Sequence, residues 1–169
     1  EQLTDQGWRP TDKGAKANLC VVNTCTVTGK AAMQSRQAVR RLVRDHPHAL
    51  VVVTGCYAQV APEAFAAIHG VDYVVGHAFK DQIARLASPH KRCQSGVTLI
   101  EDLSASRLFQ DLPVTRFGDR TRPFVKIQDG CDAFCTYCII PRARGPSRSL
   151  SPDIVTKRIR RLKESGYSE

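Results

Sequence analysis

Three cysteines, Cys131, Cys135 and Cys138, lie within the segment GCDAFCTYCIIPRARGPSRS at residues 130–149. Thiolates are soft ligands for iron and zinc, and an iron–sulfur cluster normally takes four of them. Three thiolates can instead hold a cubane of four irons and four sulfides, which leaves one iron open to a small molecule that offers an amine and a carboxylate. The CxxxCxxC spacing therefore predicts a [4Fe–4S] cluster with one open iron.

A zinc site is the main alternative interpretation of these cysteines. A zinc knuckle would use Cys135 and Cys138 with a second close pair, usually another CxxC or an HxxxH. The sequence offers no such pair. Disulfides are also disfavoured, because the cysteine count is seven and the first ten residues do not resemble a secretion signal.

Two further cysteines, Cys25 and Cys56, each follow an apolar run that predicts a strand, in LCVVNTC and LVVVTGC. The carboxyl ends of parallel strands share one edge of a sheet, so these two thiols are expected to converge there. At this point both are either metal ligands or small buried hydrophobic residues. Cys20 alternates with its neighbours in a predicted strand and is expected in the core, whereas Cys93 lies in a polar segment without an evident role.

Basic residues follow the cysteine segment directly, at Arg142, Arg144 and Arg148. Guanidinium groups form charge-assisted, partly bidentate hydrogen bonds, so these side chains can bind a phosphate backbone or the carboxylate of a cofactor. A solvated basic loop is the alternative. The formal net charge of +9 likewise favours a polyanionic partner, above all nucleic acid.

Two predicted helix faces and the histidines carry weaker signals. Arg36, Arg40 and Arg44 repeat at spacing four, and KRIRRLK occupies residues 157–163. Each of these faces is either an RNA contact or only solvated. The five histidines occur singly, without metal-ligand spacing, and are expected in solvated loops or at helix ends.

The apolar pattern predicts the elements that must position these residues. Strands are expected at 19–22, 50–53 and 73–76, and helices at 30–46, 62–70 and 79–87. Short β-branched runs of this kind are typical of strands buried on both faces of a parallel sheet. Strands that alternate with helices over short connections predict an open parallel α/β domain with right-handed crossovers at residues 1–87.

The periodic pattern dissolves between residues 88 and 120, and this stretch is predicted to be an interdomain linker. A strand at 124–128 then leads into the cysteine segment. SPDIVTKRIRRLKESGY predicts a helix with Ser151 at its N-cap and Gly166 at its end. Residues 121–169 are therefore expected to form the first strand–loop–helix unit of a second α/β domain.

Three blocks of sequence, NTCTVT (23–28), TGCYAQ (54–59) and KIQDGCDAFCTYCIIPRARGPSRS (126–149), resemble the methylthiotransferase family of radical S-adenosylmethionine enzymes. Their flanking residues are most similar to the branch that modifies N6-threonylcarbamoyladenosine beside the tRNA anticodon. The resemblance covers nearly the whole chain. It implies an α/β fold: an open parallel-sheet amino-terminal methylthiotransferase domain with its first strand missing upstream, a linker, and the beginning of a radical S-adenosylmethionine partial TIM barrel.

The resemblance implies two [4Fe–4S] clusters and S-adenosyl-L-methionine as cofactors. The radical-generating cluster would be bound by three cysteines: Cys131, Cys135 and Cys138. Tyr137 would lie near the adenine of S-adenosylmethionine, and Arg144 and Arg148 are further candidate contacts to that cofactor. One-electron reduction would cleave S-adenosylmethionine to the 5′-deoxyadenosyl radical, which abstracts hydrogen from C2 of the adenine ring of the substrate.

The resemblance also implies an auxiliary cluster, bound by Cys25, Cys56 and a third cysteine. That third ligand is expected in a Gly-Cys turn upstream of this sequence, and Cys20 is wrongly placed to replace it. The auxiliary cluster would carry the sulfur that is methylated and transferred. Because this ligand and most of the radical domain are missing, the sequence is expected to be a fragment that is inactive alone.

The implied partners are the tRNA anticodon stem-loop, an electron donor such as flavodoxin or ferredoxin, and a sulfur donor. The implied protein is cytoplasmic and makes no use of a membrane. The expected product is 2-methylthio-N6-threonylcarbamoyladenosine at position 37 of tRNA. Three alternatives stay open: methylthiolation of isopentenyladenosine in tRNA, methylthiolation of a ribosomal-protein aspartate, and a zinc-stabilised RNA-binding module without catalysis.

Overall fold

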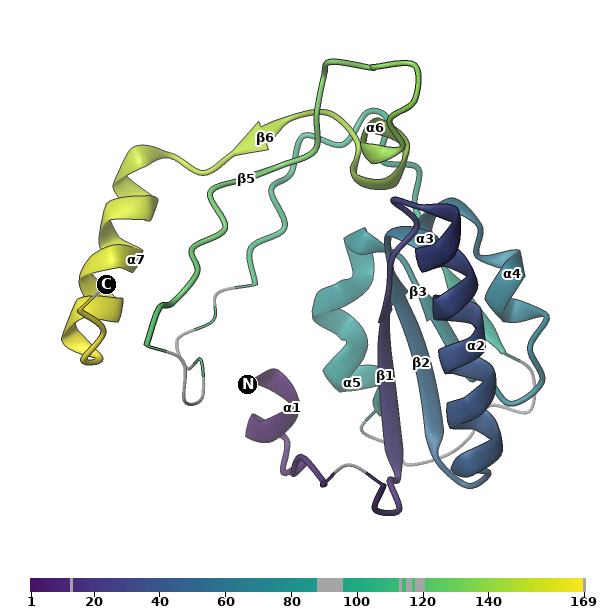
Figure 1. The fold of residues 1–169 in the computed structure, drawn as a ribbon. Coiled ribbons are helices and arrows are strands. Elements are labelled where there is room, and N and C mark those ends of the chain that lie inside the picture. Colours follow the sequence, from purple (N-terminus) through teal and green to yellow (C-terminus); the bar gives the residue numbers. More distant parts are fainter. Residues whose placement is uncertain (13, 88–95, 113, 115–116, 118–120, 169) are drawn as a thin grey trace.

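The computed structural model describes residues 1–12, 14–87, 96–112, 114, 117 and 121–168. Its centre is a parallel sheet in the order β1–β2–β3–β4 (Figure 1). The strands are β1 (Leu19–Thr24), β2 (Leu50–Gly55), β3 (Tyr73–Val75) and β4 (Val97–Leu99). The predicted α/β fold class with an open parallel sheet is confirmed.

Helices cover both faces of this sheet (Figure 1). They are α1 (Gln2–Asp5), α2 (Gly29–Asp45), α3 (Cys56–Val60), α4 (Glu63–Ala66), the 3₁₀ helix η1 (His77–Gln82) and α5 (Ile83–Ala87). Val39 of α2 and Phe65 of α4 pack with Val51 and Val53 on one face. On the other face, Leu50, Val52 and Val75 pack with Ala87 of α5. As expected for a central parallel strand, β2 is buried along its whole length.

The linker prediction is wrong in part, because β4 belongs to the first sheet. Val97–Leu99 pairs in parallel with Tyr73–Val75, although it lies inside the predicted linker 88–120. A half-exposed strand of three residues is too short to show periodicity in the sequence. Residues 88–95, which include Cys93, lie outside the described residues. The proposed domain boundaries at 87 and 121 stay predictions.

The second part of the chain has less regular structure than predicted. Strand β5 is limited to Gln128–Asp129 and pairs in an antiparallel manner with β6 (Arg148–Ser149), so the strand predicted at 124–128 is largely wrong. The cysteine loop between them ends in α6 (Ile140–Arg144). The predicted last helix is present as α7 (Pro152–Glu164), although Ser151 makes no side-chain capping bond. The partial barrel is not visible in the described residues and stays a prediction.

Candidate metal centre

Cys25 and Cys56 lie at the carboxyl edge of the sheet, as predicted. Strands β1 and β2 pair in register up to Thr24 and Gly55, the residues that immediately precede the two cysteines. Cys25 is exposed, whereas Cys56 begins α3 and is only 8% exposed. The parallel register therefore places two cysteines that are far apart in the sequence at neighbouring strand ends.

Gly55 permits the turn that places Cys56. Its φ of +101° is in the region that favours glycine, and a Cβ atom there would lie 2.3 Å from the carbonyl oxygen of Thr24. No other residue fits so close to the backbone of β1. The TGC sequence thus fixes α3 against the end of the neighbouring strand.

Ser35 of α2 holds the backbone of Cys25 from the other side. The Cys25 N–H donates to Ser35 Oγ at 3.2 Å, and this hydroxyl lies 3.3 Å from the Cys25 carbonyl oxygen and 2.8 Å from that of Ala31. The side chain of Thr28 accepts a hydrogen bond from the Ala31 N–H at 3.1 Å and caps the helix. Helix α2 therefore anchors the turn that carries the exposed thiol.

The three cysteines of the second segment occupy one loop closed at its base. The Cys131 N–H donates to the Gly145 carbonyl at 3.1 Å, and the Cys138 N–H donates to the Cys135 carbonyl at 2.9 Å. Gly130 adopts a φ of +78°, and a Cβ atom there would lie 2.0 Å from the carbonyl oxygen of Pro146. The two ends of the loop can approach this closely only because position 130 has no side chain.

The tip of this loop is open to solvent. Tyr137 is 89% exposed and Phe134 adopts a φ of +45°, a conformation uncommon for a bulky residue. A cavity of about 340 Å³ is lined by residues 134–139, Pro141 and Arg142, including Cys135 and Cys138. The predicted cofactor residue Tyr137 therefore lies beside the candidate ligands, on an accessible surface.

The three thiols of the loop are the type of ligand that an iron–sulfur cluster takes. In the described residues, however, they are not arranged as a complete ligand set. All three cysteines of the loop are free. Within the described part of the chain, no group of three or more His, Cys, Asp and Glu side chains lies close enough to hold a metal ion. Soft thiol donors on an accessible loop fit a thiolate-bound cluster, and binding would have to draw them together.

The two cysteine segments meet through Arg144. Helix α6 packs against α3, and the Arg144 guanidinium hydrogen-bonds the Cys56 thiol, which raises the pKa of Arg144. Its Nη1 also lies 3.3 Å from Oδ1 of Asp129. Burial alone would raise the pKa of Asp129, but the Lys126 ammonium at 2.6 Å and the Arg144 guanidinium outweigh it and lower that pKa. Arg144 thus lies between the two predicted sites.

Arg148, the other predicted cofactor contact, connects backbone segments. Its Nη1 donates to Ser106 Oγ at 3.2 Å and to the Leu108 carbonyl at 3.3 Å, and its Nη2 donates to the Arg144 carbonyl. These contacts tie α6 to the segment that follows β4. The structure therefore gives Arg148 a structural role at this place.

His77 and Lys80 of η1 lie near the same edge. His77 begins this helix, and a helix end is one of the two expected positions, but it is half-buried. Burial lowers the pKa of His77 to about 4, and the neighbouring Lys80 ammonium acts in the same direction. Burial also lowers the pKa of Lys80, with Cys56 acting against it. The isolated GHA sequence gave no signal of this burial, because it arises from contacts between distant segments.

Gln59 connects the helix that begins at Cys56 to two other segments by hydrogen bonds. It is buried, its Oε1 accepts from the His77 N–H at 2.9 Å, and its Nε2 donates to the Glu101 carbonyl at 2.9 Å. Sequence reasoning missed this role, although Gln59 lies in the TGCYAQ block.

The predicted basic faces differ in their surroundings. The Arg36 guanidinium hydrogen-bonds Tyr57 Oη and lies 5.5 Å from the centre of that ring, so it connects α2 with α3. Arg44 forms an exposed ion pair with the adjacent Asp45. Arg36 thus has an internal contact with Tyr57. The RNA contact proposed for the face formed by Arg36, Arg40 and Arg44 stays a prediction.

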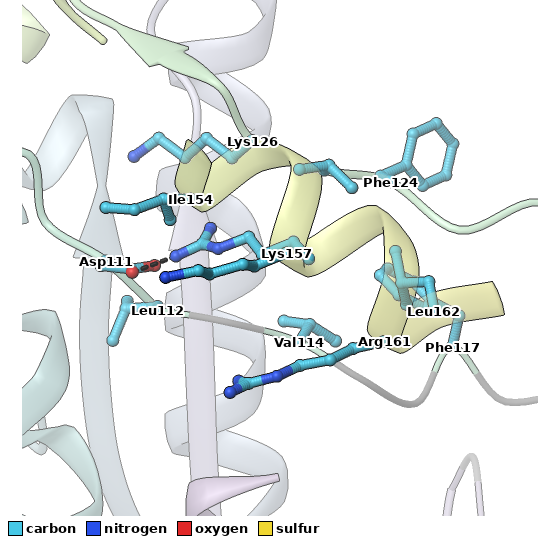
Figure 2. Close-up of a pocket in the computed structure, with 12 residues that line it drawn as sticks. Asp111, Leu112, Val114, Phe117, Phe124, Lys126, Ile154, Lys157, Arg161 and Leu162 are labelled. Carbon is cyan, nitrogen blue, oxygen red and sulfur yellow. Dashed lines mark hydrogen bonds and ion pairs between the residues drawn. The ribbon is translucent and has the colours of Figure 1, made fainter. Parts of the chain in front are cut away.

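A separate cavity of about 440 Å³ lies between α7 and residues 111, 112, 114, 117 and 124–126 (Figure 2). Its apolar lining includes Leu112, Phe124 and Ile154, and Arg158 forms an ion pair with Asp111 on its wall. None of the six cysteines in the described residues lines it. This cavity is not part of the candidate metal centre.

Comparison with known proteins shows what the chain is similar to. Residues 1–76 match the family described as uncharacterized protein family UPF0004. Over 98% of its length, the chain is 39% identical to the threonylcarbamoyladenosine tRNA methylthiotransferase MtaB of Bacillus subtilis. Over its whole length it is 36% identical to the protein of that name from Chlamydia pneumoniae. It is 30% identical, over 99% of its length, to the tRNA-2-methylthio-N(6)-dimethylallyladenosine synthase of Clostridium perfringens.

The fold and the cysteine edge define an open parallel α/β domain of the UPF0004 type, followed by a cysteine loop. Over nearly its whole length, the chain is similar to proteins named as tRNA methylthiotransferases. It spans 37% of the length of the Bacillus and Chlamydia relatives and 38% of the Clostridium relative. Among the described residues, no helix is both long enough and apolar enough to cross a membrane.

Proposed function

We propose that this chain is part of a tRNA methylthiotransferase that adds a methylthio group to C2 of N6-threonylcarbamoyladenosine at position 37 of tRNA by radical S-adenosylmethionine chemistry. The observation that carries the proposal is the meeting of two cysteine segments at one sheet edge. Helix α6 of the second segment packs against α3, which begins at Cys56 of the first segment. The similarity to relatives that carry this activity in their names supports the substrate.

Two groups of residues would hold two [4Fe–4S] clusters. Cys131, Cys135 and Cys138 would bind the first, and Cys25 and Cys56 would bind the second with a ligand from elsewhere in the protein. When bound, these clusters would supply an electron for cleavage of S-adenosylmethionine and a place for the sulfur to be transferred.

The protein itself contributes binding and placement. Tyr137 offers an accessible aromatic surface next to Cys138, suited to stacking on the adenine of S-adenosylmethionine. Cys56 is buried, whereas Cys25 is exposed to solvent. The side of the auxiliary cluster next to Cys25 would therefore face the substrate. Arg142 on the cavity wall and the net charge of +9 suit a polyanionic tRNA partner.

Analysis of tRNA nucleosides tests the substrate. A strain that lacks the gene for the full-length protein should lose 2-methylthio-N6-threonylcarbamoyladenosine, and the intact gene should restore it. Loss of the methylthiolated isopentenyladenosine instead would favour the related tRNA activity. Unchanged tRNA nucleosides together with an unmodified ribosomal-protein aspartate would favour the protein substrate. A reductant and a sulfur donor are required in every case.

Metal analysis tests the class of protein. Full-length protein purified without oxygen should contain about eight irons and eight sulfides per chain, which corresponds to two cubanes. Stoichiometric zinc with no sulfide would contradict the proposal and favour the zinc-stabilised RNA-binding module.

A further inference from the structure

Arg144 has partners from both parts of the chain. Its guanidinium hydrogen-bonds the thiol of Cys56 at the start of α3, and its Nη1 lies 3.3 Å from the Asp129 carboxylate in β5. Asp129 comes two positions before Cys131, the first cysteine of the loop. One side chain thus connects a candidate ligand of one site with the base of the loop that carries the other.

The backbone around Arg144 is held in place from several sides. Ala143 is fully buried, and the Arg144 carbonyl accepts a hydrogen bond from Arg148. Gly145 adopts a φ of +75°, and a Cβ atom there would lie 2.4 Å from the carbonyl oxygen of Leu103. The backbone that carries the Arg144 side chain is therefore fixed relative to the segment that follows β4.

We propose that Arg144 is a positioning residue that fixes Cys56 relative to the cysteine loop and donates a hydrogen bond to its sulfur when that sulfur is a cluster ligand. This inference rests on the proposed function, which makes Cys56 a ligand of the auxiliary cluster. A cationic donor at a ligating sulfur stabilises negative charge there and so raises the reduction potential of the cluster.

The geometry requires arginine at this position. A guanidinium offers several N–H groups in a rigid plane and can serve a sulfur and a carboxylate at the same time. A lysine ammonium would keep the charge as a point donor without this planar fork. Arg144→Lys should therefore preserve only part of the effect, and Arg144→Gln should remove it.

The first experiment uses full-length protein in which Cys131, Cys135 and Cys138 are all replaced by Ala, so that only the auxiliary cluster remains. Redox titration followed by electron paramagnetic resonance gives its midpoint potential. Arg144→Gln should lower this potential and alter the spectrum, and Arg144→Lys should give an intermediate value. Arg41→Gln, which removes the same charge from an exposed position of α2, should leave both unchanged. An Arg144→Gln protein with the parental potential and spectrum would overturn the proposal.

A second experiment tests the contact itself, with metal-free full-length protein. In Arg144→Cys, a short bis-methanethiosulfonate reagent should link position 144 to Cys56, as detected by mass spectrometry of peptides. Arg41→Cys should give no link to Cys56. Absence of the link in Arg144→Cys would overturn the proposed contact whatever the metal content. If the link forms but Cys56→Ala retains a normal auxiliary cluster, the ligand assignment in the proposed function has failed while the contact stands.

Discussion

The hydroxyl of Thr24 at the end of β1 accepts a hydrogen bond from the backbone N–H of Ala58 in α3 at 3.1 Å. The same hydroxyl donates to the Thr54 carbonyl of β2 at 2.7 Å. Thr24 is buried, so both bonds are protected from water. One side chain therefore fastens the helix that starts at Cys56 to the two strands whose ends carry the candidate ligands.

Thr24→Val should destabilise the protein by about 1–3 kcal/mol, because it leaves the buried Ala58 N–H without its partner. The free energy of unfolding from urea titration measures this. Thr98→Val, at an exposed position of β4, is the matched control and should change stability by less than about 0.5 kcal/mol. Equal effects of the two variants would contradict the anchoring role of Thr24.

Gly55→Ala should destabilise the protein by more than about 1 kcal/mol, because the new Cβ would collide with the Thr24 backbone at a strained φ. Gly29→Ala is the contrasting change: its Cβ meets nothing within 4 Å, and Gly29 lies in α2. That variant should be neutral or stabilising by up to about 1 kcal/mol. Thermal unfolding of both variants checks the difference, and a tolerated Gly55→Ala would refute the close approach.

The stability of the protein should fall between about pH 6.5 and pH 4 in part because of His77. Its pKa is about 4 in the folded protein and 6.5 when exposed, so the unfolded chain binds more protons in this range. The contribution is complete above pH 6.5 and is lost as the pH falls, up to about 3 kcal/mol in all. Lys80, Lys126, Arg144 and Asp129 are the charged groups that act on His77.

Urea unfolding across this pH range should show a shallower slope for His77→Gln than for the parent protein. His48→Gln, at an exposed position, is the control and should follow the parent curve. Parallel curves for His77→Gln and the parent would show that the imidazole is not buried in its neutral form.

The two cysteine sets should have separable roles in the full-length enzyme. Cys135→Ala should abolish reductive cleavage of S-adenosylmethionine while the auxiliary cluster remains, since it would remove a ligand of the proposed radical-generating cluster only. Cys56→Ala should leave cleavage intact and abolish sulfur transfer to tRNA. Chromatography of 5′-deoxyadenosine and mass spectrometry of nucleosides measure the two steps. Identical losses in both variants would be inconsistent with this division.

The sequence predicted those strands and helices that have a clear periodic pattern of apolar residues. The strands around Val21, Val52 and Val74 and the cores of α2 and α7 have clear periodicity and end signals, and their register places Cys25 and Cys56 at one edge as expected. Buried Cys20 was likewise predictable from its alternation in β1. Such elements carry their own sequence signature.

The remaining features depend on contacts between distant segments. β4 is too short for a periodic signal, and the burial of His77 comes from neighbours in other parts of the chain. The link from Arg144 to Cys56 joins residues 88 positions apart (144 minus 56), and no local pattern encodes such a pairing. The sequence predicted that Arg144 could bind a phosphate or a carboxylate. The Cys56 thiol as a partner of Arg144 became evident only from the structure.

The position of β4 also sets where the protein can be divided. A recombinant piece that stops at residue 87 would strip the outer strand from the sheet and remove Glu101, whose carbonyl accepts from buried Gln59. It would also remove Leu103, which is buried. Expression trials of the isolated amino-terminal domain should therefore extend past residue 103, or the exposed sheet margin will invite aggregation.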